Sequence, residues 1–268
     1  MKPYIFFKTS AKINLGRNFI KCIIAFLFVS LLPSLILLLP SSLNLSKIHT
    51  LILIILSTFI LIPCFKIGAI GFMIDSMEKK ETSLGNMFDG FLYIFKLIPL
   101  ILSKIISYIP LMLVIFLAYK LISKEAMDIL REYALDPAKN IDMLVKIPQS
   151  DFYTMFFTEL GVVVSIILSI IINAYVSLTN YILYSEKLSG IKAVIKSIKL
   201  MKGHILYYIG FNLSFFIWYI VSAFTQGFSD TIFIPYKEAS FIMFYKFLNG
   251  EFPDKTIAQT DYDIKEEE

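Results

Sequence analysis

Charged residues are scarce in this chain. Asp, Glu, Lys and Arg make up 17% of its 268 residues, whereas hydrophobic residues make up 57%. A soluble domain of this size could not bury that much apolar surface, so the composition excludes an ordinary soluble globular protein. It predicts instead a protein whose solvent is a lipid bilayer.

Cysteine and histidine are rarer still, with two residues of each. Cys22 and Cys64 fall in or beside apolar runs, which favours two small buried side chains over a disulfide framework or a metal cluster. His49 and His204 fall in or beside loops that we expect on opposite sides of the membrane. We therefore expect no metal site and no cofactor.

Sequence motifs of common enzymes are missing. The chain has no glycine-rich phosphate loop, no C-x-x-C, no H-E-x-x-H and no G-x-S-x-G. Intramembrane proteolysis by paired aspartates would need two aspartates at depth, and the confident apolar runs contain none. These absences predict a protein that is not an enzyme.

Long uncharged runs are what the chain has instead. A helix of about 20 apolar residues crosses the roughly 30 Å hydrocarbon core with its backbone hydrogen bonds satisfied internally. We expect an all-α fold, a polytopic transmembrane helical bundle with amphipathic interfacial helices, as a single integral membrane domain over residues 1–248. The expected spans are residues 19–40, 50–65, 98–119, 157–184, 205–225 and 229–248.

The sixth run is the least regular, because Pro235, Lys237 and Glu238 interrupt it. It could span, kink or lie partly in the interface, and its length favours spanning. The first run follows five Lys or Arg residues, as a signal peptide would. Its apolar core is longer than is usual for a signal peptide and no small-x-small cleavage site closes it, so we expect an uncleaved first helix.

Positive charge predicts how the chain threads, because Lys and Arg in short loops stay on the cytoplasmic side. Segments 1–21, 66–96 and 185–204 carry five, four and five Lys or Arg residues. The alternating segments 41–49 and 120–153 carry one and five. We therefore expect a protein of the cell (cytoplasmic) membrane whose N-terminus is cytoplasmic.

Two segments are expected to lie outside the bilayer. The exterior loop 120–153 has apolar residues at helical spacing on either side of Asp136-Pro137, which predicts two short amphipathic helices on the outer surface. The tail, residues 249–268, holds seven acidic residues and two lysines, a composition typical of a disordered end.

The segment GIKAVIKSIKLMKGH, residues 190–204, concentrates positive charge between two apolar runs. As a helix it places Ile191, Val194, Ile195, Ile198 and Met201 on one face. Such a helix lies in a membrane interface with its lysines toward anionic headgroups. Nucleic-acid binding needs no such apolar face, so we expect a lipid partner and no nucleic acid. The interfacial lysines are Lys192, Lys196, Lys199 and Lys202.

A short pattern occurs twice in the chain. Ser10–Arg17 and Ser197–His204 both read S-x-K-[IL]-x-x-G-[RH], and both lead directly into an apolar run. A third segment, Ser83–Phe91, also mixes polar and apolar residues before a run. The pattern predicts an internal repeat, used three times, of an interfacial helix, an outward span and a returning span.

Small and polar residues recur every four positions in the fourth and fifth runs. This spacing keeps them on one helix face, where small side chains let two helices approach closely. We expect the two spans to pack together along these stripes; a polar pathway past Asn173, Asn180 and Asn212 is the alternative. The packing residues are Gly161, Ser165, Ser169 and Ser177 in the fourth run and Gly210, Ser214 and Ser222 in the fifth.

Ionisable groups near apolar runs are the strongest functional candidates, because a charge in hydrocarbon costs at least a few kcal/mol unless it is paired or hydrated. Interfacial or mutually paired charges are the alternative reading. The candidates for contact with a substrate or ion are Glu159, Asp230 and Glu238, together with the amides of Asn173 and Asn212.

A set of residues after Asn173 has a characteristic order and spacing: Ala193, Ile195, Ser197, Met201–His204, Leu213–Phe215, Ile217, Trp218, Gly227, Pro235, Tyr236, Ala239, Phe244 and Tyr245. In these residues the chain resembles a large bacterial family of uncharacterised multi-pass membrane proteins, distantly similar to the membrane domain of some glycerophosphodiester phosphodiesterases. The family's Ile-Pro-Gly stretch before the fourth span is missing, and Gly227–Asp230 replaces a more glycine-rich turn. The resemblance implies a fold and a location, and no activity.

Two functional hypotheses follow from these features. The first is a non-enzymatic membrane protein that supports or regulates envelope or export components through a membrane protein partner. The second is a transporter or peptide-immunity protein that handles a small amphipathic substrate through the bundle. A membrane enzyme would be a third, and no motif favours it.

Overall fold

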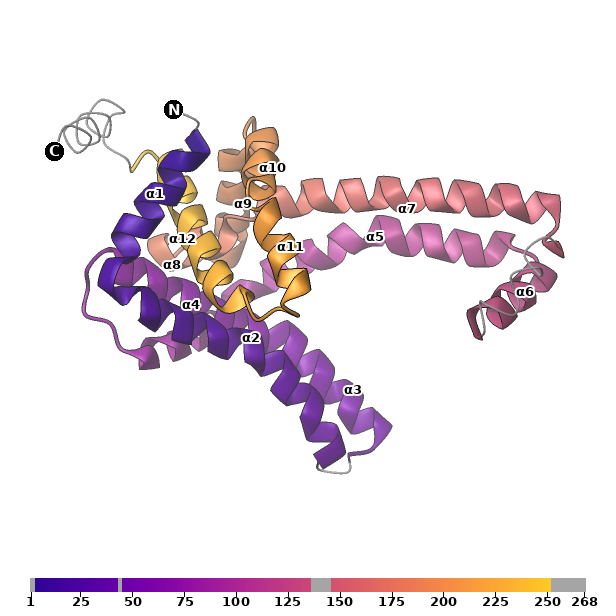
Figure 1. Cartoon of the computed structure of the whole chain (residues 1–268), viewed down its shortest axis with the longest axis horizontal. Helices are drawn as coiled ribbons and strands as arrows, with labels where there is room; N and C mark the ends of the chain where they lie inside the picture. Colours follow the sequence, from indigo (N-terminus) through magenta and orange to yellow (C-terminus); the bar gives the residue numbers. More distant parts are fainter. Residues whose placement is uncertain (1–2, 43–44, 136–145, 252–268) are drawn as a thin grey trace. The chain divides into compact units, whose positions relative to one another are not determined.

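A computed structural model of the chain describes residues 3–42, 45–135 and 146–251. Every regular element in these ranges is a helix (Figure 1), which confirms the expected all-α class. The chain divides into two compact units, residues 1–101 with 175–268, and residues 102–174. We call them unit 1 and unit 2. Most of the acidic tail and the second helix expected near Asp136-Pro137 lie outside the described residues.

Within the residues that the structure describes, three continuous helical runs are long and apolar enough to cross a membrane: Lys47–Met77, Leu84–Leu121 and Gln149–Glu186. Two bent pairs raise the number to five if each pair is one span. They are Tyr4–Leu15 with Phe19–Leu32, bent by 103°, and Ile205–Leu213 with Phe216–Phe224, bent by 42°. Uncharged runs of this length form helices because a helix satisfies its own backbone polar groups.

The helices follow one another in three repeats, each with an amphipathic helix, a leading helix and a returning helix, the order that the repeated sequence pattern predicts. The first comprises α1 (Pro3–Leu15), η1 (Gly16–Asn18), α2 (Phe19–Ser42), α3 (Lys47–Leu56), η2 (Ser57–Leu61) and α4 (Ile62–Met77). The second comprises η3 (Leu84–Leu97), α5 (Ile98–Leu121), α6 (Lys124–Leu135), α7 (Gln149–Val176) and α8 (Thr179–Glu186). The third comprises α9 (Gly190–Met201), α10 (Ile205–Leu213), α11 (Phe216–Phe224) and α12 (Asp230–Leu248).

Within unit 1, each amphipathic helix packs on the returning helix of the preceding repeat. η3 packs on α4, and α9 packs on α8. α1 has no repeat before it and packs on α12 of the last repeat, so the arrangement closes into a ring. Figure 1 shows α1 and α12 side by side although they come from opposite ends of the chain. The returning helices therefore form the core of unit 1.

The contact between η3 and α4 brings two backbones together. A Cβ atom built at Gly68 would stand 1.8 Å from the carbonyl oxygen of Met87, so no other residue fits there without a shift. The contact of α9 is similar, because a Cβ at Gly190 would stand 2.1 Å from the carbonyl oxygen of Lys96. Small residues thus set how closely the amphipathic helices approach their neighbours.

Aromatic rings fill the contact between α1 and α12. Phe7 is 1% exposed, and its ring lies 5.7 Å from that of Phe244 and 5.6 Å from that of Phe211, both in edge-on geometry. Edge-on pairs contribute about 0.5–1.5 kcal/mol beyond their buried area. This cluster holds the N-terminal helix against the end of the repeat array.

The repeated S-x-K pattern ends in a backbone turn in both of its copies. Gly16 has φ +40 and Gly203 has φ +85, and each ends an amphipathic helix before the chain enters a leading helix. Residues other than glycine rarely adopt these angles, which explains the glycine at this position of the pattern.

Unit 2 consists of the outer part of α5, α6 and α7. Asn173 of α7 donates a hydrogen bond to Ser107 Oγ of α5 over 3.1 Å. At the other end of the unit, the buried carboxylate of Asp151 accepts hydrogen bonds from the backbone N–H and the hydroxyl of Ser123, at 2.9 and 2.7 Å. These bonds hold the turn that leads into α6.

The helices differ in extent from the runs expected from the sequence. The helical run that begins at Lys47 continues to Met77, well beyond residue 65, because small and apolar residues follow Lys66 and pack in unit 1. The fifth run is bent between α10 and α11, where Ser214 donates its hydroxyl to the carbonyl of Phe211 over 2.6 Å. A serine bond of this kind commonly bends a helix.

Candidate functional site

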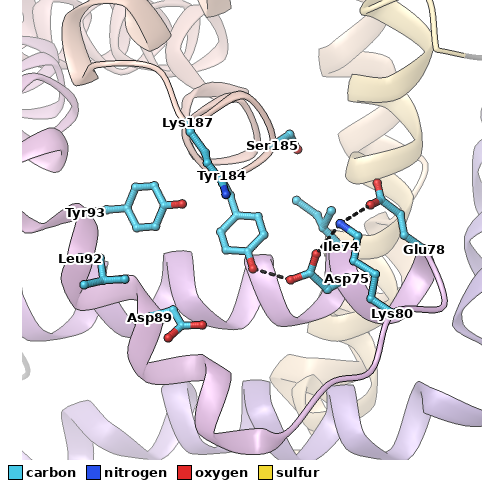
Figure 2. Close-up of a pocket in the computed structure, with 10 residues that line it drawn as sticks. All are labelled: Ile74, Asp75, Glu78, Lys80, Asp89, Leu92, Tyr93, Tyr184, Ser185 and Lys187. Atoms are coloured by element: carbon cyan, nitrogen blue, oxygen red, sulfur yellow. Dashed lines mark hydrogen bonds and ion pairs between the residues drawn. The ribbon is translucent and has the colours of Figure 1, made fainter.

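A polar pocket of about 490 Å³ opens in unit 1 where α4, η3 and α8 meet (Figure 2). α4 and α8 contribute their C-terminal ends, and η3 contributes one face. The residues that line it are Ile74, Asp75, Glu78, Lys80, Asp89, Leu92, Tyr93, Tyr184, Ser185 and Lys187. Its volume falls within the range of about 300–1,000 Å³ that is usual for small-molecule sites.

The end of α4 shapes one wall of the pocket. Lys79 adopts φ +59, and the backbone N–H of Lys80 donates to the carbonyl of Asp75 over 3.0 Å, which reverses the chain. This reversal returns the Lys80 ammonium to the helix end, 2.9 Å from Asp75 and 2.8 Å from Glu78 (Figure 2). Carboxylates are unfavourable at a helix C-terminus, so the lysine offsets both the dipole and the paired negative charge.

Glu78 also joins α4 to α12. Its second oxygen lies 2.8 Å from Lys246 Nζ. Partial burial of the Glu78 carboxylate opposes its ionisation, but hydrogen bonds from Lys246 and Lys80 outweigh this and lower its pKa. The hydrogen bonds to Glu78 and Asp75 raise the pKa of Lys80. Glu78 and Lys80 are therefore both charged near neutral pH.

Two tyrosines form the aromatic side of the pocket. Tyr184 of α8 donates its hydroxyl to Asp75, and its ring centre lies 6.0 Å from that of Tyr93 of η3. η3 begins at Ser83, whose backbone N–H donates to Asn86 Oδ1 over 3.0 Å while its hydroxyl accepts from Gly85 N–H. This cap fixes the start of η3 and so the position of its pocket-lining face.

A second polar cluster lies farther along the returning helices. Lys66 of α4 is 3.3 Å from Glu238 of α12, and Glu238 also accepts the hydroxyl of Tyr181 from α8. The Glu238 side chain is 13% exposed and that of Lys66 is 43% exposed. One charged group from each of two returning helices and a hydroxyl from the third therefore meet at this point.

Three buried polar atoms of the same part of the chain have no hydrogen-bond partner among the described residues. They are Thr179 Oγ1, Asn180 Oδ1 and Tyr207 Oη. Polar atoms of this kind are normally satisfied by protein or by water.

The five residues predicted to contact a substrate or ion belong to both units. Glu159 and Asn173 belong to α7 of unit 2, where Glu159 is exposed and Asn173 bonds to Ser107 and Ser169. The others, Asn212, Asp230 and Glu238, belong to unit 1. Within the described ranges, Glu238 is the one of the five that forms an ion pair, and it lies in the second cluster.

Asn212 and Asp230 have local roles in the described structure. Asn212 donates to the carbonyl of Tyr208 one turn earlier, over 3.1 Å. Asp230 is the first residue of α12, where its negative charge favours the positive end of the helix dipole. Neither residue lines the pocket.

The stripes of small residues face neighbours that their spacing could not identify. In unit 2, a Cβ at Gly161 would lie 3.1 Å from Val114 of α5. In unit 1, a Cβ at Gly210 would lie 2.5 Å from the hydroxyl of Tyr4 in α1. A stripe of small residues indicates a close helix contact. Here Gly161 contacts α5 and Gly210 contacts α1. Direct packing of the fourth run on the fifth stays a prediction.

The lysine-rich helix α9 turns its smallest residues to the protein. Gly190, Ala193, Ser197 and Met201 are buried, whereas Ile191, Ile195 and Ile198 are exposed. Lys192, Lys199 and Lys202 are exposed, and Lys196 pairs with Glu186 at 2.6 Å. The helix thus has three faces: a small one toward α8, an exposed isoleucine stripe, and a basic one.

Sequence reasoning missed the pocket and Lys66. Asp75, Tyr93 and Tyr184 come from three separate segments, and each is an ordinary residue in its own context. Lys66 stands at the edge of an expected span, so it was counted among loop charges. The missed signal was the Asp75–Glu78–Lys80 spacing, which places three charges at one helix end.

A family comparison covers nearly the whole chain. The family described as proteins of unknown function, DUF975, matches residues 1–251. The chain belongs to the DUF975 family. This confirms the expected membership in an uncharacterised family, and the match includes all the repeats and both polar clusters. No curated protein and no solved structure matches the chain. In the described part of this DUF975 protein, no three His, Cys, Asp or Glu residues gather as a metal site would require.

Proposed function

We propose that this protein is a non-enzymatic, multi-pass protein of the bacterial cytoplasmic membrane. The observation that carries the proposal is the apolar surface of its long helices. Large hydrophobic side chains stand exposed along α5 and α7, among them Ile106, Phe116, Phe157 and Ile167 at 54, 57, 66 and 51%. Exposure to water costs roughly 25 cal/mol per Å² of apolar surface, and a bilayer removes that cost.

In this proposal six segments span the membrane. Five of them are the candidate spans described above, and α12 is the sixth. Its Pro235 and Glu238 face the interior of unit 1 rather than lipid. The basic residues in segments 1–21, 66–96 and 185–204 support a cytoplasmic N-terminus and cytoplasmic α9 lysines. A distant similarity to the membrane domain of glycerophosphodiester phosphodiesterases is part of the same proposal.

Cysteine labelling tests the location and the orientation. The native Cys22 and Cys64 are buried and free, so they contribute little background. In intact cells a membrane-impermeant maleimide should label Lys124→Cys of α6 and leave Lys192→Cys of α9 unlabelled until the membrane is opened. Labelling of Lys192→Cys alone would reverse the orientation, and recovery of the protein in the soluble fraction would refute the membrane location.

The role that we propose is support or regulation of an envelope or export component through a membrane protein partner. The absence of catalytic motifs from the sequence and the exposed apolar stripe of α9 support it. Purification in mild detergent should recover one protein partner reproducibly. An α9 variant with Ile191→Ser and Ile195→Ser tests whether that stripe is used, with Ile13→Ser of α1, also exposed, as the control. Repeated recovery of the protein without a partner would refute this role.

The cluster of Lys66, Glu238 and Tyr181 favours a second candidate, a transporter or peptide-immunity protein for a small amphipathic substrate. Ionisable groups between spanning helices commonly belong to substrate or proton pathways. The double variant Glu238→Ala, Asp230→Ala should then abolish the flux or resistance phenotype at unchanged abundance in the membrane. An unchanged phenotype would remove this candidate, and Asp128→Ala on α6 serves as the control for lost surface charge.

A further inference from the structure

The pocket contains two opposite charges that its other groups leave unpaired. Asp75 and Glu78 are neutralised by Lys80, and Glu78 by Lys246 as well. Asp89 and Lys187 line the same pocket, and within the described residues neither side chain makes a hydrogen bond or an ion pair. An unpaired carboxylate and an unpaired ammonium in one cavity complement a ligand that carries both charges.

The pocket is also built to recognise a donor-bearing cation. Figure 2 shows the carboxylate of Asp89 and the phenol groups of Tyr93 and Tyr184 on the side of the cavity that η3 and α8 form. Carboxylate and phenol oxygens accept hydrogen bonds, and the face of a tyrosine ring attracts a cation. A primary ammonium offers three N–H donors to such acceptors, whereas a trimethylammonium offers none.

An exposed apolar stripe leads away from the pocket along η3. Leu92 lines the pocket and is 78% exposed, and Phe95, one turn further along, is 82% exposed. Phe88 is 59% exposed, and its ring also packs edge-on against Phe65 of α4. Met87, Gly90, Tyr93 and Leu97 of η3 are buried. A ligand with a zwitterionic head and apolar chains would match the pocket and the stripe together.

We propose that the pocket binds the headgroup of a phospholipid that carries a primary ammonium, of which phosphatidylethanolamine is the simplest. The ammonium would lie against Asp89 and the phosphate against Lys187, with the acyl chains along Leu92, Phe88 and Phe95. The inference rests on the proposed membrane location, because it needs η3 at the depth of the headgroups. It adds a specific lipid ligand, which the proposed function does not require.

Native mass spectrometry of the full-length protein tests the site. The protein is extracted in mild detergent from bilayers that contain equal parts of phosphatidylethanolamine, phosphatidylcholine and phosphatidylglycerol. We expect retention of phosphatidylethanolamine at least about tenfold above each of the other two lipids, because only its headgroup can form a hydrogen-bonded ion pair with Asp89. Equal retention of the three lipids would overturn the proposal.

Two substitutions then locate the binding. Asp89→Asn should abolish the preference for phosphatidylethanolamine. Lys187→Gln should lower the retention of all three lipids, because each of them carries a phosphate. Asp128→Asn and Lys124→Gln on α6 remove the same charges from exposed positions of unit 2 and should leave both the preference and the retention intact. The elution profile and helical circular dichroism of each variant show whether it is folded. A preference that survives Asp89→Asn, or a retention unchanged by Lys187→Gln, in folded protein would overturn the site.

A soluble competitor separates a lipid from a free zwitterion. Glycerophosphoethanolamine carries the same headgroup without acyl chains, and we expect it to displace the lipid only at a concentration at least about tenfold higher, because the apolar stripe adds buried area. Displacement at an equal concentration would overturn the lipid assignment. If the cysteine labelling succeeds and lipid selectivity fails, the proposed membrane location stands and the pocket assignment does not.

Discussion

Gly90 of η3 lies directly against the carbonyl oxygen of Cys64 in α4, where a Cβ atom would stand 1.9 Å away. Together with the reciprocal approach of Gly68 to Met87, this interlocks the two helices backbone to backbone. The neighbouring atoms belong to the main chain and cannot rotate aside. The position of the pocket wall formed by η3 therefore depends on a residue without a side chain.

Gly90→Ala is expected to destabilise the protein by about 1–3 kcal/mol, the usual cost of overpacking. Gly85→Ala on the same helix is the control, because the nearest atom to its Cβ would be 3.6 Å away. Thermal unfolding in detergent, followed by circular dichroism, measures both. Equal melting temperatures for the two variants would contradict the interlocked contact.

Ser197 is expected to stabilise the turn between α7 and α8. Its buried hydroxyl donates to the carbonyl of Tyr175 over 2.7 Å and accepts from the N–H of Leu178 over 3.2 Å. Ser197→Ala leaves both backbone groups without a partner and should cost about 1–3 kcal/mol. Ser189→Ala, at a helix start where the side chain makes no capping bond, should cost much less in the same unfolding experiment.

The pair of Lys66 and Glu238 is expected to show coupling in a double-mutant cycle. Glu238→Leu removes the acceptor of both Lys66 and Tyr181, and should destabilise by about 1–3 kcal/mol. Lys66→Met with Glu238→Leu removes both charges, so the double variant should lose less than the sum of the two single losses. Strictly additive losses in chemical unfolding would mean that the pair does not interact in solution.

The ion pairs of Glu78 should make stability depend on pH at the acid end. Its pKa in the folded protein is lowered from the ordinary value of 4.5, so its contribution is full above 4.5 and is lost as the pH falls through the lowered value. Because these groups are partly exposed, we expect the loss to stay below about 1 kcal/mol. Glu78→Gln should remove this loss of stability at acid pH, measured by unfolding across the pH range. If the variant loses as much stability at acid pH as the native protein does, the pairing is contradicted.

The stability contribution of Lys80 has the opposite pH dependence. Its pKa is raised, so its contribution is full below the ordinary value of 10.5 and is lost only as the pH rises through the raised value. Lys80→Met should therefore lower stability by a similar small amount throughout the neutral range. Lys79→Met removes the neighbouring charge and so tests for a general charge effect. Because Lys79 adopts φ +59, which glycine tolerates well, Lys79→Gly removes the same charge and better preserves the backbone conformation.

The helices could be predicted from the sequence because their signals are local. Apolar run length, amphipathic spacing and the glycine that ends the S-x-K pattern each depend on residues within a few turns of one another. Glu238 could be singled out for the same reason, because a charge inside an apolar run is visible without a partner. Its partner Lys66 was not found, because it stands at a run's edge where lysine is ordinary.

The tertiary structure decided which surfaces meet. The closure of α1 on α12 joins opposite ends of the chain, and the pocket joins residues between Ile74 and Lys187. The stripes that contain Gly161 and Gly210 predicted close helix contacts, but they did not identify Val114 and Tyr4 as the residues contacted. Local periodicity states which face of a helix is to be buried, whereas the partner of that face depends on the packing of all the other helices, which no single segment encodes.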